Sequence, residues 1–139
     1  MKSVSALRVL LAAAASIGFA CAALPVSVSN AAPTSDATAG DATAGKAVFS
    51  RCAACHSANP GVNKIGPSLA GIVGSQSGAV PGFNFSPGMK SAKVTWDASS
   101  LDKFLKNPNG FIHGTKMFFS VPNASDRQNV IAYLETLKH

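Results

Sequence analysis

The sequence predicts a small all-α domain in which helices are joined by long loops. Apolar residues recur at helical spacing in several separate segments, whereas no run alternates convincingly with the period of two that marks a half-buried strand. The 139 residues include 12 glycines and 8 prolines, which interrupt any long helix. A chain of this length forms one domain of ordinary size.

The first two helical signals are short. Asp41 or Thr43 can serve as the N-cap of a helix that continues through Phe49 and ends near a pair of cysteines. Apolar residues in the segment 69–73 then predict one or two further turns of helix, which Gly74 closes.

A glycine- and proline-rich stretch, residues 78–88, separates these signals from the next helix. Irregular backbone of that length in a small domain is normally packed against something. A helix follows up to Lys106, for which Asp97 or Ser99 is the expected N-cap, and Pro108 prevents its continuation.

The C-terminal segment has the clearest helical signals. Asn123 or Ser125 together with Gln128 resembles a capping box, and Asp126 suits the positive end of a helix. One face of this helix is apolar and carries Val130, Ile131, Leu134 and Leu137. We therefore expect three main helices, with shorter ones among the loops.

The first 31 residues have the pattern of a cleaved export signal. Lys2 and Arg8 precede an uncharged apolar segment, and small residues lead to an expected cleavage site after Ala31, with Ala23 as the earlier alternative. An uncleaved membrane anchor is disfavoured because the apolar run is shorter than the ~20 residues that span a bilayer. A lipoprotein attached through Cys21 is a weaker alternative still. The expected location is the periplasm.

Cleavage there leaves a flexible leader, residues 32–44, and one domain, residues 45–139. The leader contains a duplicated pentapeptide, Asp-Ala-Thr-Ala-Gly, that is too short to be a structural repeat. The formal net charge of +6 falls to +4 without Lys2 and Arg8. Only Cys52 and Cys55 remain, too few for a disulfide-rich scaffold, so another element must stabilise a glycine- and proline-rich domain.

The chemistry is concentrated in Cys52-Ala-Ala-Cys55-His56. Such a string can be a redox dithiol, part of a zinc site, or an attachment site for c-type haem. A dithiol site would be expected in a βαβ context, and zinc would need a fourth ligand from His113 or His139. A haem attachment site requires two thiols about a helical turn apart and an imidazole beside them, and this segment has both. Covalent haem would also supply the missing core.

The residues themselves leave the second axial ligand of such a haem open. The candidates are Met89, Met117, His113 and His139, of which the last is at the chain end. Both methionines fall in predicted loops, and plain core filling is the ordinary role of a buried methionine.

The segment from Gly45 to Leu137 resembles a class I cytochrome c of the mitochondrial and alphaproteobacterial type. The motifs occur in the family's order and nearly at its spacing. They are Gly45-Lys-Ala-Val-Phe49, Cys52-x-x-Cys-His56, Lys64-x-Gly66-Pro67-x-Leu69, Pro81-Gly-Phe83, Trp96, Asn107-Pro108, Gly114-Thr-Lys-Met117 with Phe119, and Ile131-Ala-Tyr-Leu134.

This resemblance implies a small cytochrome c fold around one covalent haem c, with His56 and Met117 as axial ligands. It implies that the Pro67 carbonyl accepts the His56 ring proton, and that Thr115 and Trp96 bind the haem propionates. The chain departs from the family at positions that usually carry polar groups. Those positions are occupied by Ser75, Phe85, Met89 and Phe104, of which the last three make the pocket more apolar.

The resemblance also implies an electron carrier rather than an enzyme. Its donor would be a cytochrome bc complex or a dehydrogenase, and its acceptor a terminal oxidase or a photosynthetic reaction centre. A haem c subunit dedicated to one dehydrogenase is the alternative, as is a small haem peroxidase if Met117 is not a ligand.

Excess lysine predicts how such a carrier meets its partners. Lysines in segments that resemble the family's haem-edge surface would attract acidic docking sites, although simple solvation of helices is the plainer explanation. They are Lys64, Lys90, Lys93, Lys103, Lys106 and Lys116, with Lys64, Lys90 and Lys116 foremost. Nucleic acid is disfavoured because no basic motif is interleaved with aromatics. We expect a monomer without stable membrane insertion.

Overall fold

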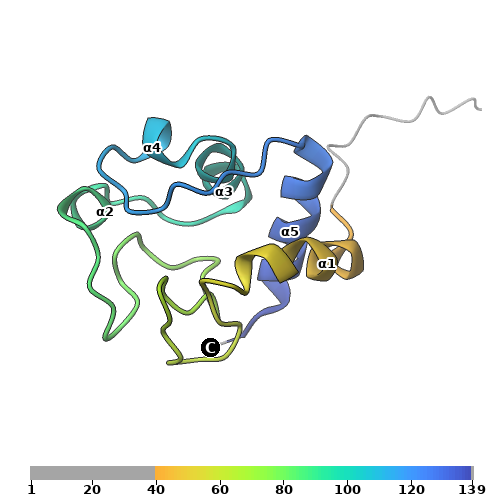
Figure 1. Cartoon of the computed structure of the whole chain (residues 1–139), viewed down its shortest axis with the longest axis horizontal. Coiled ribbons are helices and arrows are strands. Elements are labelled where there is room, and N and C mark those ends of the chain that lie inside the picture. The colour runs from red at the N-terminus through yellow and green to blue at the C-terminus, as the bar shows by residue number, and fades with distance from the viewer. Residues whose placement is uncertain (1–39, 139) are drawn as a thin grey trace, which may run out of the picture. The chain divides into compact units, whose positions relative to one another are not determined.

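Five helices lie within residues 40–138, the part of the chain that this computed structural model describes (Figure 1). They are α1 (Ala42–Cys52), α2 (Pro87–Ser91), α3 (Ala98–Lys106), α4 (Pro108–Phe111) and α5 (Ala124–Thr136). Among these residues no strand forms, and a single bridge between Gln76 and Thr95 is the only β-type pairing. The all-α prediction is confirmed. The predicted export signal, most of the predicted leader, Cys21 and His139 lie outside the described residues.

The first helix begins where the capping residue predicts. The Asp41 carboxylate accepts hydrogen bonds from the amides of Thr43 and Ala44, at 2.7 and 3.3 Å. The structure thus places residues 41–44, which the sequence suggests are the end of a leader, in the cap and first turn of α1. Gly40, directly before this cap, lies against Gln128 of α5, and α1 itself packs on α5. These contacts explain why the helix starts this early.

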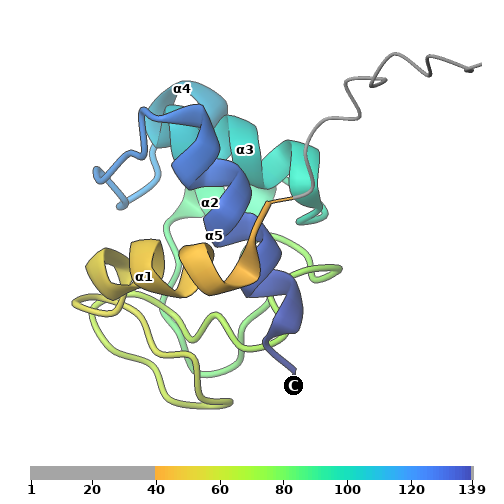
Figure 2. The same ribbon diagram turned by 90° about the vertical axis from the view of Figure 1, so that its right-hand side faces the viewer.

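Helices α1 and α5 cross in close contact (Figure 2). Gly45 makes this approach possible, because a Cβ atom at that position would overlap the Asn129 carbonyl of α5. Next to the crossing, the rings of Phe49 and Tyr133 lie 5.1 Å apart at a tilted angle. The Asn123 side chain caps α5 by accepting from the Asp126 amide at 3.0 Å, so Asn123 is the cap and not Ser125, and the predicted capping box with Gln128 does not form.

A capping box fixes the start of α3. The Asp97 carboxylate accepts from the Ser100 amide at 2.7 Å, and the Ser100 hydroxyl accepts from the Asp97 amide at 2.8 Å. These hydrogen bonds hold the pKa of Asp97 below its ordinary value. The helix ends before Pro108, as expected, but a further short helix, α4, follows at once because Asn107 caps it.

Two local predictions were wrong. Residues 69–74 form turns rather than a helix, because Gly71 and Gly74 have positive φ angles of 61° and 86° and their amides bond to Leu137 and Trp96 instead. Met89 does not lie in a loop. It belongs to α2, whose N-cap is Ser86 and whose first residue is Pro87.

The buried core is small and lies mainly on α3, α5 and the segments beside them. Its aliphatic centre is Val121 and Val130, whose exposed fractions are 0% and 1%. The other buried apolar residues are Phe49, Ile72, Met89, Trp96, Leu101, Phe104, Leu105, Ile112, Ile131 and Leu134. Many of these residues also face a cavity, so a large part of the core is formed by its walls.

Candidate functional site

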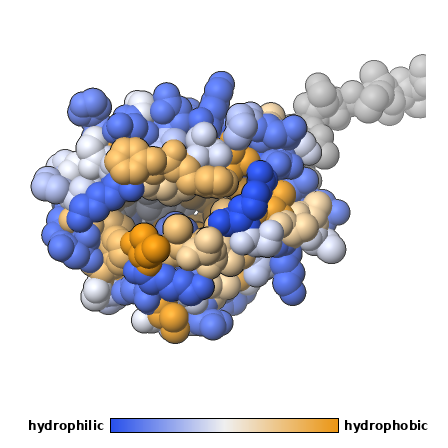
Figure 3. All heavy atoms as spheres, in the orientation of Figure 1, coloured by the Kyte–Doolittle hydropathy of each residue, from blue (hydrophilic) through white to orange (hydrophobic). Residues whose placement is uncertain are grey.

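The cavity has a volume of about 290 Å³ and opens on one face of the domain, where apolar side chains form its rim (Figure 3). Residues far apart in the sequence converge on it. All seven residues for which the sequence predicts haem contact or ligation line it. They are Cys52, Cys55, His56, Trp96, Thr115, Met117 and Pro67.

The last residue of α1, Cys52, and the turn that follows it present the two thiols. The amides of Cys55 and His56 both donate to the Cys52 carbonyl, at 3.0 and 2.9 Å, so the chain turns tightly after the helix. The two cysteines form no disulfide with each other, and Cys52 is half-buried whereas Cys55 is exposed. Burial raises the pKa of Cys52, which keeps this thiol protonated at neutral pH.

The His56 ring is fixed in the neutral form that can bind iron. Its Nδ1 lies 2.7 Å from the Pro67 carbonyl, so Nδ1 carries the proton and donates it, and Nε2 keeps its lone pair. Burial lowers the pKa of the imidazole, and the neighbouring ammonium of Lys64 lowers it further, although the bond to Pro67 opposes both.

Gly66 closes the wall behind the histidine. Its amide donates to the Cys55 carbonyl at 2.8 Å, and a Cβ atom on it would overlap the His56 ring. The sequence shows Gly66 only as part of a motif. Gly66 does not have a positive φ angle, so its backbone conformation does not require glycine. A glycine directly before Pro67 is therefore the sequence signal for this close approach.

Two thioethers face the same cavity. Met117 is half-buried and its amide donates to the Thr115 hydroxyl at 3.3 Å. Met89, from α2, is buried at 9% exposure and also lines the cavity. His113 is exposed and is not part of the lining. The candidates for a second iron ligand within the described residues are therefore the two methionines.

The remaining wall is aromatic and apolar, as the departures from the family pattern predict. Phe85, Met89 and Phe104 all line the cavity, and the Phe104 ring stacks on Trp96 at 5.0 Å. Ser75 does not reach it, because its hydroxyl donates to the Ile72 carbonyl at 2.7 Å.

The three foremost predicted docking lysines differ in their surroundings. The Lys64 ammonium donates to the Ala53 carbonyl at 2.8 Å, where it balances the negative end of α1. Lys116 lines the cavity and reaches the Asn84 carbonyl at 3.5 Å. Lys90 is exposed in the last turn of α2.

The donor set and the shape of the cavity fit a covalently bound haem. Two thiols, an imidazole with a free Nε2 and a thioether share one apolar space, and the glycine that packs on the imidazole leaves it no alternative position. Buried Thr115 and Trp96 provide polar hydrogens on the lining, suited to the carboxylates of the group.

Comparison with known proteins agrees with this fit. The family model described as cytochrome c matches residues 42–138. The chain is 43% identical over 100 residues to cytochrome c2 from Rhodomicrobium vannielii, a match that covers 70% of this chain and 80% of the relative. It is 48% identical over 90 residues to cytochrome c from Euglena viridis, covering 64% of this chain and 88% of the relative.

Two solved structures share the fold. Cytochrome c2 from Rhodospirillum centenum superposes with a TM-score of 0.68 at 34% identity, covering 72% of this chain and all of that chain. Cytochrome cH from Methylobacterium extorquens gives 0.66 at 39% identity, covering 70% and 99%. The cysteine pair beside His56, the cavity and the family match together identify the chain as a member of the cytochrome c family, an electron carrier and not an enzyme, with one covalent haem c.

Proposed function

We propose that this protein is a periplasmic one-electron carrier in which His56 and Met117 are the axial ligands of the haem iron, attached through Cys52 and Cys55. The haem, when bound, supplies an iron that alternates between the ferric and ferrous states. His56 supports the proposal most strongly, because its Nδ1 bond to Pro67 directs Nε2 away from that carbonyl and leaves it free for the iron.

Met117 is the better of the two thioethers for the opposite position. It lies in a segment without helical structure beside Thr115, whereas Met89 is held in α2 and is almost fully buried. A side chain in a short loop can adjust its sulfur to the iron at smaller cost than one whose backbone is fixed by a capped helix. Ligands on both sides of the iron suit electron transfer, since no position is left for a substrate.

Electrostatics supports transient docking with acidic partners. Four of the five carboxylates within residues 40–138 are engaged within the fold: Asp41 and Asp97 cap helices, and Asp102 and Asp126 pair with arginines. The lysines of that segment form no such pairs, so their charge is available at the surface. We propose that Lys64, Lys90 and Lys116 meet an acidic surface of a cytochrome bc complex, a dehydrogenase, an oxidase or a reaction centre.

Location in the periplasm is the last part of the proposal. It is supported by the charge pattern and apolar segment of residues 2–31, which lie outside the described structure. No helix among the described residues is long and apolar enough to cross a membrane.

Ligation is tested on the purified ferric holoprotein by its visible spectrum. Coordination of a methionine sulfur gives a weak band at the red end, which should be present in the wild type, absent in Met117→Ala, and retained in the control Met89→Leu. Loss of the band in Met89→Leu but not in Met117→Ala would assign the ligand to the other methionine. A high-spin wild type that readily binds cyanide would contradict the proposal.

Docking is tested by the rate of electron transfer to a partner as ionic strength rises. The wild-type rate should fall steeply, and Lys116→Glu, which changes a lysine of the cavity lining, should lower it about tenfold at low salt. Lys46→Glu, on the exposed side of α1, makes the same charge change outside the cavity lining and is the matched control. Equal effects of the two variants would show a response to net charge instead of a docking surface.

A further inference from the structure

The segment that carries Met117 has few restraints of its own. We call residues 115–122 the Met117 strap. At its start the Thr115 amide donates to the Ile112 carbonyl at 3.2 Å, and at its end the Val121 amide donates to the Leu105 carbonyl at 2.8 Å. Between Met117 and Val121, the backbone groups of residues 118–120 make no hydrogen bond with any described residue. The position of the strap therefore depends on its two ends.

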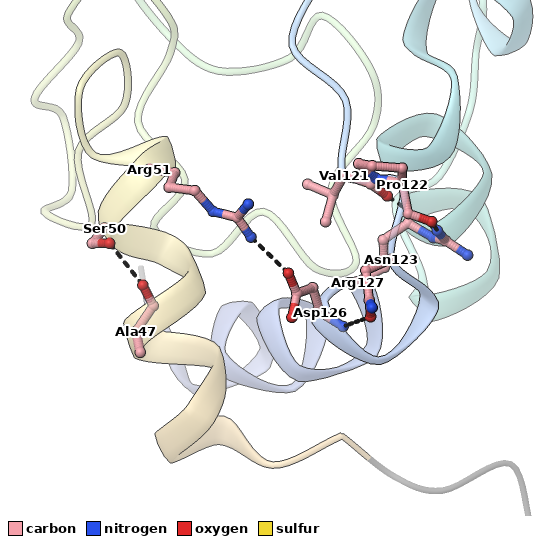
Figure 4. A network of polar contacts seen from close by, with 8 residues as sticks. All are labelled: Ala47, Ser50, Arg51, Val121, Pro122, Asn123, Asp126 and Arg127. Atoms are coloured by element: carbon pink, nitrogen blue, oxygen red, sulfur yellow. Dashed lines mark hydrogen bonds and ion pairs between the residues drawn. The ribbon is translucent and has the colours of Figure 1, made fainter.

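A buried arginine holds the C-terminal end. Arg127 lies in the first turns of α5, and its Nη1 donates to the carbonyls of both Val121 and Pro122, at 3.0 and 2.8 Å (Figure 4). Its Nε donates to the Asp102 carboxylate of α3 at 2.7 Å. One guanidinium thus joins two helices to two consecutive peptide groups of the strap.

The guanidinium of Arg127 is buried and therefore depends on its hydrogen-bond partners. The Arg127 side chain is only 7% exposed, and Asp102 is 33% exposed. A buried guanidinium requires all its partners, because a charge left without them in a low-dielectric site is strongly unfavourable. If Asp102 no longer balances the charge, the arginine gains by moving toward water, and its two bonds to the strap are lost with it.

A second Arg–Asp pair that involves α5 serves as a comparison. Arg51 of α1 pairs with Asp126 of α5 at 2.8 Å, but both side chains are well exposed, at 48% and 38%, and neither bonds to the strap (Figure 4). Exposed pairs of this kind contribute little to stability. Two Arg–Asp pairs that meet α5 therefore differ in whether they hold the segment with Met117.

We infer that Asp102 and Arg127 are positioning residues for Met117: they keep the strap closed and so set how often its sulfur leaves the iron. This rests on the proposed function, since it requires Met117 as a ligand. The burial of Arg127 could have been read from the sequence, because this residue lies on the apolar face of α5. It precedes Val130, Ile131 and Leu134 by three, four and seven residues.

Added imidazole measures this opening in the ferric holoprotein, since it can take the sixth position only when the sulfur has left. Its apparent dissociation constant is the intrinsic one divided by the fraction of open strap. In Asp102→Asn we expect about tenfold tighter apparent binding, because a charged hydrogen bond that holds Arg127 is lost. Arg127→Lys, which keeps the charge but not the fork of donors, should change the affinity in the same direction.

Two controls separate positioning from general stability. Asp126→Asn removes the exposed pair and should leave the imidazole affinity within about twofold of the wild type. Ile131→Val removes one buried methylene outside the cavity lining, so it lowers the unfolding midpoint in urea without touching the strap. Its imidazole affinity should also stay close to that of the wild type.

The outcomes distinguish the inference from the function on which it rests. A wild-type protein without the red methionine band contradicts ligation by Met117, and the inference falls with it. A wild type with the band but unchanged imidazole affinity in Asp102→Asn and Arg127→Lys overturns the positioning role alone. Suppose that Ile131→Val loses as much stability as Asp102→Asn and gains as much affinity for imidazole. The Asp102–Arg127 pair would then act only through the general stability of the fold.

Discussion

The two sides of the haem cavity are held in different ways. On the His56 side, hydrogen bonds follow one another along the chain: Gly66 donates to Cys55, His56 to Pro67, and Leu69 to Ser57, all between 2.7 and 2.9 Å. On the Met117 side, the strap is fixed at its ends, and Phe118 and Phe119 at the edge of the cavity remain exposed, at 82% and 45%.

The two sides therefore differ in what they can do: the His56 side attaches the haem, and the Met117 side can change its position more easily. The side that carries the thiols and the imidazole is held by several successive hydrogen bonds, which fix the orientation of the imidazole within the fold. The strap obtains its position from one buried side chain, Arg127, which Asp102 of another helix holds in place, and from whatever its sulfur binds. We expect changes on the first side to affect the whole fold and changes on the second to affect mainly ligation.

The largest effect should come from removing the attachment. In Cys52→Ala/Cys55→Ala, the haem-free chain should be largely unfolded, because much of its core consists of the walls of an apolar cavity. Circular dichroism during heating checks this. A cooperative, native-like melting transition in the double variant would show that the helices form a sufficient core without haem.

A smaller but still large effect is expected for Gly66→Ala. The added methyl group would overlap the His56 ring, and overpacking of this kind costs about 1 to 3 kcal/mol. Urea unfolding of the holoprotein measures the loss. Ile65→Ala, at the adjacent position, removes atoms that are 82% exposed and should change stability very little. Similar losses in both variants would refute a tightly packed His56 wall.

Lys64→Gln should have an intermediate effect. The ammonium of Lys64 donates to Ala53 at the negative end of α1, and loss of such a charge costs about 0.3 to 1 kcal/mol at low salt. The free energy of unfolding of the wild type and of Lys64→Gln is measured at low and at high salt. If the difference between them does not become smaller at high salt, Lys64 has no electrostatic role.

The smallest effect is expected on the strap. Phe118→Ala should change the free energy of unfolding by no more than about 0.5 kcal/mol, because the ring is mostly in water and its backbone bonds to nothing described. A loss as large as that of Gly66→Ala would mean that the strap is held as firmly as the His56 wall, and the contrast between the two sides would disappear.

Local signals predicted the parts of the structure that depend on neighbours in sequence. Asp41, Asp97 and Asn123 cap helices because their side chains reach amides two or three residues ahead, and such contacts are readable from spacing alone. The Cys-x-x-Cys-His string is local in the same sense, and it identifies the attachment site without knowledge of the fold.

Features that depend on distant partners were not predictable in this way. The apolar spacing of residues 69–73 predicts a helix, but Gly71 and Gly74 instead donate to Leu137 and Trp96, partners that no local pattern reveals. Likewise, Met89 lines the cavity from a helix that only the Ser86 cap and Pro87 could have suggested. The choice of Met117 over Met89 as the expected iron ligand therefore came from family resemblance and not from spacing.

The ferric spectrum of the wild-type holoprotein beside that of Met117→Ala tests the proposed function most directly. With His56 and Met117 as ligands, the wild type should be low-spin with the weak red band, and the variant should lose the band and bind cyanide or imidazole readily. A wild type without the band, or a Met117→Ala protein that keeps it, would contradict a carrier in which Met117 completes the iron coordination.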